Sequence, residues 1–465
     1  MTAEIEGALR ALERAAEHAH TYLSGLDERS VGSTVEPDVL RQRLGGPLPE
    51  QGRDPVEVVD ALVRATEGGH LGSAGGRFYA WVVGGATNAS LAADWLTSAW
   101  DQNPALHSVS PSAAMAEEVV GPWLLELLDL PRDSSFALTT GCQMAHVTCL
   151  AAARQAVLER HGWDFNERGL CGAPPITVLL SAEQHASVAR ALRLLGIGTA
   201  ALRPLPVRDD GTVEPDAFAA SLSEVAGPTI VCLSAADLNI GAFDPFSALV
   251  PLAHERGAWV HVDGAFGLIA RASARYRQLF EGVELADSWA TDAHKWLNVP
   301  YDSGIALVRD REAHRRSMAM GASYLTNRSD VREPMDWNPE WSHRGRGFAL
   351  WALLQELGRE GVSAMVDRCC VHAHSLVTGI GSLEGAETLW EPTLNQGLVR
   401  FLDPHGADHD ARTDAVLAAI NASGEAFFSG TTWRGMRAMR VSVCNWRTSE
   451  EDVERAIQAA RSALG

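Results

Sequence analysis

The chain has 465 residues, of which 46% are hydrophobic and 21% are charged, as in an ordinary globular protein with a large buried core. Its 39 basic and 59 acidic residues give a formal net charge of −20, which argues against nucleic acid and anionic membranes as partners. No apolar run has the length of a membrane span, the N-terminal stretch has the pattern of an amphipathic helix and not of a signal peptide, and the seven cysteines form no CxxC pair. We therefore expect a cytoplasmic protein with reduced thiols.

Residues 1–75 are predicted to form an N-terminal arm of helices and loops. The pattern from about 80 to 165 is mainly helical, interrupted by a strand end at FALTTG. Short β-rich runs then alternate with helical runs, which favours an α/β fold with a mostly parallel sheet and helices on both faces. These runs are PITVLL (175–180), TIVCLSA (229–235), AWVHVDGA (258–265), DSWATD (287–292) and GIALVR (304–309).

Residues 321–345 have no clear period and are predicted to form a long loop, which inside a compact domain is often functional. A helix, FALWALLQELGREG, follows the loop. The remaining sequence mixes strands, GLVRFLD and RAMRVSV, with helices. We therefore predict a large domain over residues 76–345 and a smaller C-terminal α/β domain over residues 346–465.

Lys295 is the only lysine in the chain, since the other 38 of the 39 basic residues are arginine. A GC-rich genome would explain the scarcity of lysine, but it would not explain why this one stands beside His294 and close to Asp292. Arginine binds carboxylates at least as well as lysine, but only lysine loses its proton readily and attacks a carbonyl carbon. Lys295 is therefore a candidate for amine chemistry such as Schiff-base formation.

Three further motifs are predicted to reach the same edge of the sheet. Asp263 ends a hydrophobic strand, where open α/β sheets bind ligands, and could pair with a cationic ring nitrogen or cap a turn. Gly141, in TTGCQMAH, opens a helix whose backbone N–H groups could bind an anion, although most such turns only connect elements. His185 begins another helix and could stack on an aromatic cofactor, although a lone histidine is usually structural. An anion site, a carboxylate and a lysine together describe a site for pyridoxal 5'-phosphate.

Four segments of the chain resemble the group II pyridoxal-phosphate-dependent amino-acid decarboxylases, which have the aspartate aminotransferase fold (PLP fold type I). These segments are HVDGAFG, TDAHKWLNVPYDSG, TTGCQMAH and EQHASVARA. The likeness extends from TYLSGLDERSV near the start to RVSVCNWRTSEEDV near the end. It implies a homodimer with shared active sites that converts an L-amino acid to its amine and carbon dioxide.

The resemblance also implies roles for the residues around the cofactor ring. Lys295 would carry the cofactor as a Schiff base, and Asp263 would keep the ring nitrogen protonated. Ala265 and His185 would lie against opposite faces of the ring. An intact set of Lys295, Asp263 and His185 argues against a catalytically silent cofactor-binding protein, whereas an aminotransferase or a lyase of the same fold would use the same residues.

At the phosphate end, the resemblance implies that His294 contacts the phosphate. The turn formed by Gly141, Cys142 and Gln143 would supply further donors. Its side chains differ from the small or polar residues that are common in the family, but backbone donors need no particular side chain. Asp292 stands where the family often has Asp or Asn.

The evidence for a substrate comes from three residues. Tyr79 and Trp81 match a segment that lines the family's pocket, and aromatic walls would suit an aromatic or bulky apolar side chain, although core packing explains them equally well. Arg440 could meet a substrate carboxylate or form a surface ion pair. Because no dedicated site for a second carboxylate is evident, the sequence disfavours glutamate.

The loop departs from the family, because animal relatives place there a tyrosine that reprotonates Cα and REPMDWNPEW contains none. Tyr324 or a histidine would take this role, or oxygen would intercept the reaction and an aldehyde would form. Asp237 stands where many relatives have Thr or Asn, and we expect it to cap a turn and not to shift the protonation of the cofactor. Cys370 and His374 are spaced i, i+4 without a second pair, so we expect a helix interior and no metal site.

Overall fold

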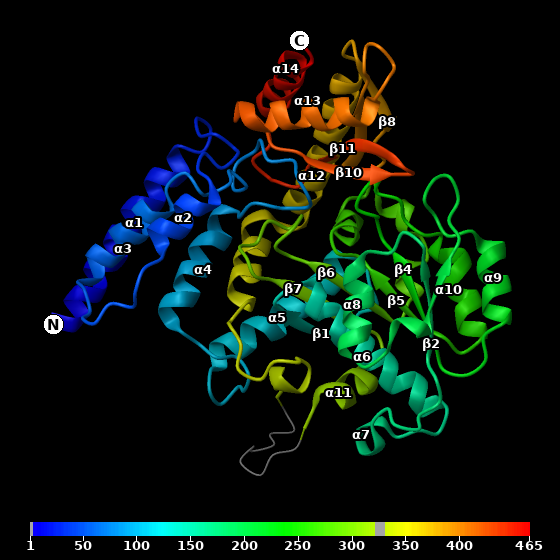
Figure 1. The fold of residues 1–465 in the computed structure, drawn as a ribbon. Coiled ribbons are helices and arrows are strands. Elements are labelled where there is room, and N and C mark those ends of the chain that lie inside the picture. Colours follow the sequence, from blue (N-terminus) through cyan, green and yellow to red (C-terminus); the bar gives the residue numbers. More distant parts are fainter. Residues whose placement is uncertain (1–2, 321–330) are drawn as a thin grey trace.

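The computed structural model describes residues 3–320 and 331–465, which form a large and a small β-sheet with surrounding helices (Figure 1). In these residues the large sheet has seven strands in the order β1-β7-β6-β5-β4-β2-β3. They are β1 Ser135–Thr139, β2 Thr177–Ser181, β3 Leu202–Leu205, β4 Thr229–Ser234, β5 Trp259–Asp263, β6 Ser288–Asp292 and β7 Gly304–Val308. Strand β7 runs antiparallel to β1 and β6, and the other neighbours are parallel. The predicted mostly parallel sheet is therefore confirmed.

Both faces of the large sheet are apolar, so each strand supplies alternate residues to two separate cores. Leu179 and Val231 join α5 and α12 in one core, whereas Val178 and Ile230 join α6 and α8 in the other. Helix α11 packs against α6, and α9 and α10 pack against each other beside the sheet. The bounds of these helices are α5 Pro111–Leu127, α6 Cys142–Arg160, α8 Ala186–Leu194, α9 Pro215–Ser223, α10 Phe246–Glu255, α11 Arg311–Met318 and α12 Gly347–Gly381, and the short α7 covers Phe165–Arg168.

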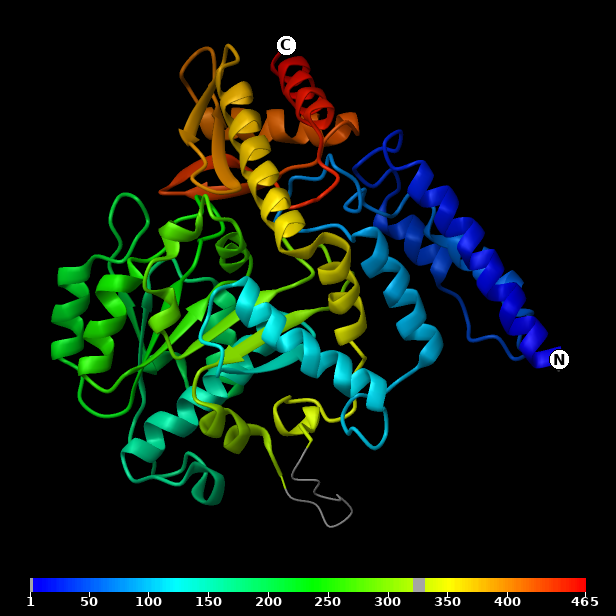
Figure 2. The same cartoon turned by 180° about the vertical axis from the view of Figure 1, so that it is seen from behind.

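The N-terminal helices project from one side of the body (Figures 1 and 2). Helix α1 packs along α3, and α2 packs against α3. Helix α4 follows them and lies along α12. Their bounds are α1 Ala3–Ser24, α2 Pro37–Leu44, α3 Pro55–Thr66 and α4 Asn88–Trp100. Among the described residues, every helix is too short or too polar to cross a lipid bilayer.

The small sheet is antiparallel and has the strand order β10-β11-β9-β8. Helix α13 and the second half of α12 pack on it, and α14 packs against these two helices (Figure 2). The bounds are β8 Ala386–Trp390, β9 Gln396–Phe401, β10 Ser429–Trp433, β11 Met436–Ser442, α13 His409–Ser423 and α14 Glu450–Leu464. The sequence predicts β9 and β11, which are largely buried, but not β8 and β10, whose residues are mostly half-exposed and polar.

Helix α12 connects the two sheets. Its backbone changes direction at Gly358, where φ is +58°, a conformation that favours glycine. The helix packs on α4 and α5 of the large domain and also on β8 and β9 of the small sheet. The boundary at residues 345 and 346 therefore stays a prediction. Cys370 is buried inside this helix, while His374 pairs with Glu391 at 3.3 Å, so the expected helix interior is confirmed.

Candidate active site

A cavity of about 440 Å³ lies at the carboxyl ends of β4, β5 and β6. Its walls come from the turns that follow these strands, from the entrances to α6 and α8, and from β11 of the small sheet. The cavity brings together all the residues to which the sequence assigns a cofactor role. These residues are Gly141, Cys142, Gln143, His185, Asp263, Ala265, Asp292, His294 and Lys295. Their individual roles stay predictions.

Lys295 lies in the turn after β6, with its Nζ 3.0 Å from Oδ2 of Asp292. Burial is the largest single influence and lowers the pKa of Lys295, but Asp292, together with Cys142 and Asp263, raises the pKa above its usual value. A Cβ on Gly84 would lie 1.8 Å from the Lys295 carbonyl oxygen, so only glycine fits against this turn. The packing fixes the backbone of Lys295 and the carboxylate fixes its amine.

The other oxygen of Asp292, Oδ1, accepts a hydrogen bond from the N–H of Cys142. It also lies 3.3 Å from Nε2 of His294. Because Nδ1 of His294 accepts from the N–H of Ser303 at 3.0 Å, Nε2 carries the proton and points it at the carboxylate. The Cys142 N–H, which the sequence assigns to a phosphate, is therefore directed to Asp292 in this structure.

Asp263 is 6% exposed and receives only uncharged donors. Gln184 Nε2 donates to Oδ2 at 3.1 Å, the Ala265 N–H donates to Oδ1 at 3.1 Å, and Nε2 of His146 lies 3.5 Å from Oδ1. Within residues 3–320 and 331–465, no lysine or arginine forms an ion pair with Asp263. This carboxylate faces the cavity, where a ligand can supply the missing positive charge.

His185 and Ala265 approach the same cavity from different elements. His185 is the N-cap of α8, and its Nδ1 lies 2.8 Å from Oγ of Ser187 and accepts from the Ser187 N–H at 3.3 Å. The cap holds the exposed imidazole at the mouth of the cavity. Ala265 is half-buried, two residues after the end of β5. Both residues are placed where a flat ring above Asp263 could contact them.

The two aromatic candidates for the substrate pocket differ in position. Trp81 is 50% exposed and lines the cavity, with its indole tilted against Phe427. Tyr79 is 0% exposed, and its ring stacks on Phe428 with 5.1 Å between centroids. Tyr79 thus packs in the core and is not among the residues that line the cavity, so its assignment to the pocket is corrected in favour of the alternative of core packing. Tyr324 lies outside the described residues.

Arg440 and Asp237 both line the cavity. Arg440 is 4% exposed, so the alternative of a surface ion pair is wrong. Its Nε and Nη2 have no hydrogen-bond partner among the described residues, and burial lowers its pKa to about 10 against the opposing charge of Asp237. Asp237 accepts from the N–H groups of Asn239 and Ile240, so the predicted turn cap is confirmed.

The sequence gives no indication that Gln184, His146 and His261 belong to the site. Gln184 and His146 contact Asp263, and His261 contacts His146. His261 and Asp263 alternate on β5 and therefore share a face of the sheet. His146 follows Cys142 by four residues on α6, so the two share a helix face. Both spacings are visible in the sequence, but only the packing of α6 on β5 brings the two histidines together.

Comparison with known proteins decides the family. The profile described as "Pyridoxal-dependent decarboxylase conserved domain" matches residues 71–402. The chain belongs to this decarboxylase family. It is 25% identical over 443 residues to an aromatic-L-amino-acid decarboxylase of Bacillus atrophaeus, covering 93% of this chain and 90% of the relative. It is 29% identical over 379 residues to an L-2,4-diaminobutyrate decarboxylase of Rhizobium meliloti (strain 1021), covering 80% and 74%.

The fold agrees with this membership. The crystal structure of Oryza sativa TDC with PLP and tryptamine superimposes with a TM-score of 0.92 at 22% identity, covering 100% of this chain and 98% of the other. The aspartate aminotransferase fold predicted from the sequence is thus confirmed. The protein is a pyridoxal-phosphate-dependent amino-acid decarboxylase, and its curated relatives act on chemically different side chains.

The residues of the cavity fit pyridoxal 5'-phosphate. Asp263 offers a buried anion that lacks a cationic partner among the described residues, as a protonated ring nitrogen requires. Lys295 offers the only side-chain amine that can condense with an aldehyde. The turn at Gly141 is tightly packed, because a Cβ on Gly304 would lie 2.4 Å from the Gly141 Cα, and it opens helix α6 toward the cavity. The ring nitrogen, the aldehyde and the phosphate of the cofactor therefore each have a complementary group in one cavity.

Proposed function

We propose that the protein decarboxylates an L-amino acid with an aromatic or bulky apolar side chain to the corresponding amine and carbon dioxide. The observation that carries the proposal is the wall around Trp81. Val82, Leu238 and Phe266 line the same cavity, so apolar surface faces the space beside the cofactor residues. Half-exposed tryptophan at the mouth of a cavity gains most from burial against a large apolar side chain.

Bound pyridoxal phosphate supplies an aldehyde that condenses with amines and a ring that accepts the electron pair left by departing carbon dioxide. The chain supplies binding and proton control. Asp292 Oδ2, 3.0 Å from the Lys295 amine, orients Nζ and raises its pKa, so Nζ becomes a nucleophile only after it loses the proton that Asp292 stabilises. Asp263 holds a proton on the ring nitrogen by its negative charge, which favours the electron-accepting form of the ring.

Arg440 is proposed to bind the α-carboxylate of the substrate. Its two unpartnered nitrogens are buried at the cavity wall, and a carboxylate can accept from both in a bidentate pair. Apart from Lys295, Arg440 is the only lysine or arginine among the described residues that line this cavity. A substrate with one carboxylate supplies the one negative charge that the guanidinium of Arg440 can pair with.

A second candidate follows from the same arginine. If Arg440 binds a carboxylate at the end of the side chain, the substrate is an acidic amino acid and its α-carboxylate lies near the apolar wall. Decarboxylation is favoured in an apolar environment that does not stabilise the departing carboxylate. The two candidates differ in which substrates depend on Arg440.

The experiment is carbon dioxide release from a panel of aromatic, branched, basic and acidic L-amino acids by wild type and Arg440→Met. We expect release from aromatic or bulky apolar substrates, lost for all of them in the variant. Release only from acidic substrates, lost in the variant, favours the second candidate. Carbon dioxide with an aldehyde in place of an amine indicates oxygen interception, and keto acid without carbon dioxide indicates an aminotransferase.

We further propose a homodimer with shared active sites. Exposed apolar side chains line a groove of about 600 Å³ between α4, α5 and α12, including Leu96, Trp100, Met115 and Trp351. Such a patch on a soluble protein marks an interaction surface. Sedimentation of wild type beside Leu96→Glu tests the assignment: a dimer that the variant dissociates is expected, and a wild-type monomer contradicts it.

A further inference from the structure

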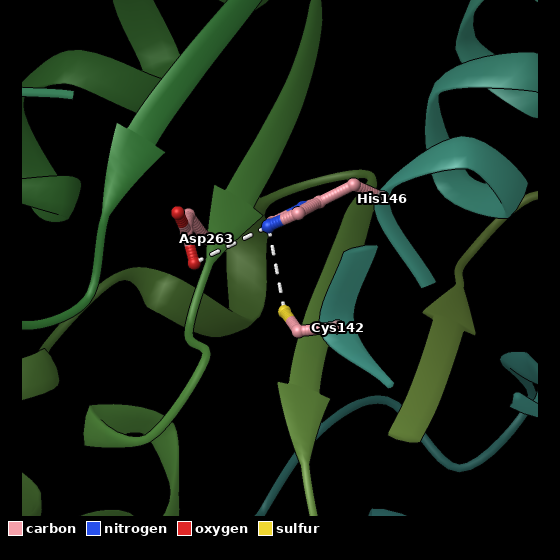
Figure 3. Close-up of side chains that lie close together, drawn as sticks. All are labelled: Cys142, His146 and Asp263. Atoms are coloured by element: carbon pink, nitrogen blue, oxygen red, sulfur yellow. Dashed lines mark hydrogen bonds and ion pairs between the residues drawn. The ribbon is translucent and has the colours of Figure 1, made fainter. Parts of the chain in front are cut away.

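Two fully buried histidines, neither of which lines the cavity, connect to Asp263. Nε2 of His146 is 3.5 Å from Oδ1 of Asp263, and Nδ1 of His146 is 2.9 Å from Nε2 of His261. The imidazole planes are nearly perpendicular, at 83°. Figure 3 shows His146 reaching from helix α6 toward Asp263 at the end of β5. The histidine pair thus connects the carboxylate to the interior of the sheet.

The connection continues past the histidines. Nδ1 of His261 lies 3.0 Å from Oγ of Ser288, and the indole N–H of Trp259 donates to the same Oγ at 2.9 Å. Trp259, His261 and Asp263 alternate along β5 and share one face, and Ser288 is paired with His261 in the register of β5 and β6. Trp259, Ser288, His261 and His146 are all fully buried.

The carboxylate of Asp263 sets the direction of the hydrogen bonds in this row, because it can only accept, and the indole of Trp259 at the other end can only donate. Ser288 accepts from Trp259 and turns its own hydroxyl hydrogen to Nδ1 of His261. His261 is then protonated on Nε2 and donates to His146, which is protonated on Nε2 and directs that proton at Asp263. The reverse direction would point a nitrogen lone pair at the carboxylate.

The row is uncharged. Burial lowers the pKa of His146, although the neighbouring carboxylates of Asp263 and Asp292 oppose the shift, and it lowers the pKa of His261 well below its usual value. Lys295 and His185, across the cavity, act on His146 in the same direction as burial. Neutral His146 therefore donates to Asp263, and neutral His261 donates to His146, so the carboxylate keeps its charge.

We propose that His146, backed by His261, is a positioning residue that holds Asp263 ionised and turned toward the ring nitrogen of the cofactor. The inference rests on the proposed role of Asp263. A cation in place of His146 would complete the ion pair of Asp263 and leave no charge for the ring. A neutral donor instead stabilises the anion by hydrogen bonding and leaves its charge for the cofactor.

Cys142 offers a competing explanation, because its Sγ lies 3.4 Å from Nε2 of His146 and the donor atoms of Cys142, His146 and Asp263 lie within 4.8 Å of one another (Figure 3). A soft metal ion could bridge such a group. The group offers three donor atoms, whereas a closed structural metal site has four, so the hydrogen-bonded row is the better assignment.

The test compares His146→Leu, which removes both nitrogens, with His146→Gln, which keeps an N–H donor. The readouts are the dissociation constant of pyridoxal phosphate from the apoprotein and the visible absorbance of the bound cofactor as a function of pH. We expect His146→Leu to bind the cofactor about tenfold more weakly and to lose the protonated-ring absorbance at lower pH. His146→Gln should recover most of both properties.

Three further variants keep the result interpretable. His314→Leu removes another fully buried histidine, bonded to Ser135 and to the Trp337 carbonyl oxygen, and should lower stability without changing either readout. Ser288→Ala should change both readouts in the same direction as His146→Leu but less. Asp263→Asn should change both more strongly than any histidine variant.

The outcomes separate the proposed role of His146 from the proposed role of Asp263, on which it rests. If Asp263→Asn changes both readouts and His146→Leu matches wild type, the role of His146 is wrong and the role of Asp263 stands. If Asp263→Asn also matches wild type, the proposed role of Asp263 fails. Equal losses in His146→Gln, His146→Leu and Cys142→Ser, with metal found in the purified wild type, would overturn the hydrogen-bonded row in favour of a metal site.

Discussion

Asp263 and Asp292 end two neighbouring parallel strands and are both almost fully buried, at 6% and 2% exposure, yet their partners differ. Asp292 holds the Lys295 ammonium at 3.0 Å. Asp263 receives only neutral donors among the described residues. A buried carboxylate without a cation is costly unless a ligand completes the pair, so the unpaired one marks where the cofactor's cation belongs and the paired one marks the reacting amine.

The largest effect is expected from Asp263→Asn, which removes the charge that the ring nitrogen requires. Breaking a buried charge pair costs about 3–5 kcal/mol, which corresponds to about 10²–10⁴-fold in kcat/KM. Carbon dioxide release at saturating cofactor measures it. If kcat/KM of Asp263→Asn stays within threefold of wild type, the proposed difference between Asp263 and Asp292 is wrong.

Gly304→Ala should disturb the surroundings of Asp292 at the end of β6 and leave those of Asp263 at the end of β5 unchanged. Gly304 is paired with Asp292 in the register of β6 and β7, and an added Cβ would lie 2.4 Å from the Gly141 Cα. Backbone must shift, at a cost of about 1–3 kcal/mol in the free energy of unfolding. Denaturant unfolding measures this loss, and weaker cofactor binding should accompany it. Undiminished stability would mean that the turn is not tightly packed.

Asp292→Asn should have the smallest effect, which should appear as a shift of a pH profile. Because the Asp292 carboxylate raises the pKa of Lys295, its removal lowers that pKa. The rate at which the apoprotein forms its visible band with pyridoxal phosphate rises with pH as Lys295 loses its proton. The pH profile of this rate should move to lower pH in the variant, whereas an unchanged profile would show that Asp292 does not control the amine.

The sequence predicts the strand ends well, because a hydrophobic run followed by a polar residue marks the edge of a parallel sheet. Lys295 and Asp263 therefore lie at one cavity as their positions indicate. The sequence does not separate Tyr79 from Trp81, because the two aromatic residues are two positions apart and only the packing shows that one is buried and the other half-exposed. His146 was missed because its contact with Asp263 spans two elements that only the packing of α6 on the sheet brings together.

The electrostatic details also depend on the three-dimensional arrangement. The backbone turn at Cys142 is visible in the sequence as a helix entrance, but the direction of its N–H toward Asp292 is not. The burial of Arg440 follows from the packing of the small sheet over the cavity, whereas its sequence context allows a surface position equally well.

The most direct measurement fixes the bound cofactor to the protein with borohydride and maps the labelled peptide, in wild type, Lys295→Ala and Lys295→Arg. Arginine keeps a positive charge beside Asp292 but does not condense with an aldehyde, so it separates the ion pair from the amine chemistry. We predict a visible absorbance band and a single adduct on Lys295 in wild type, and neither in the two variants. An adduct elsewhere, or a band that survives in Lys295→Arg, would contradict the assignment of Lys295 as the residue that holds the cofactor.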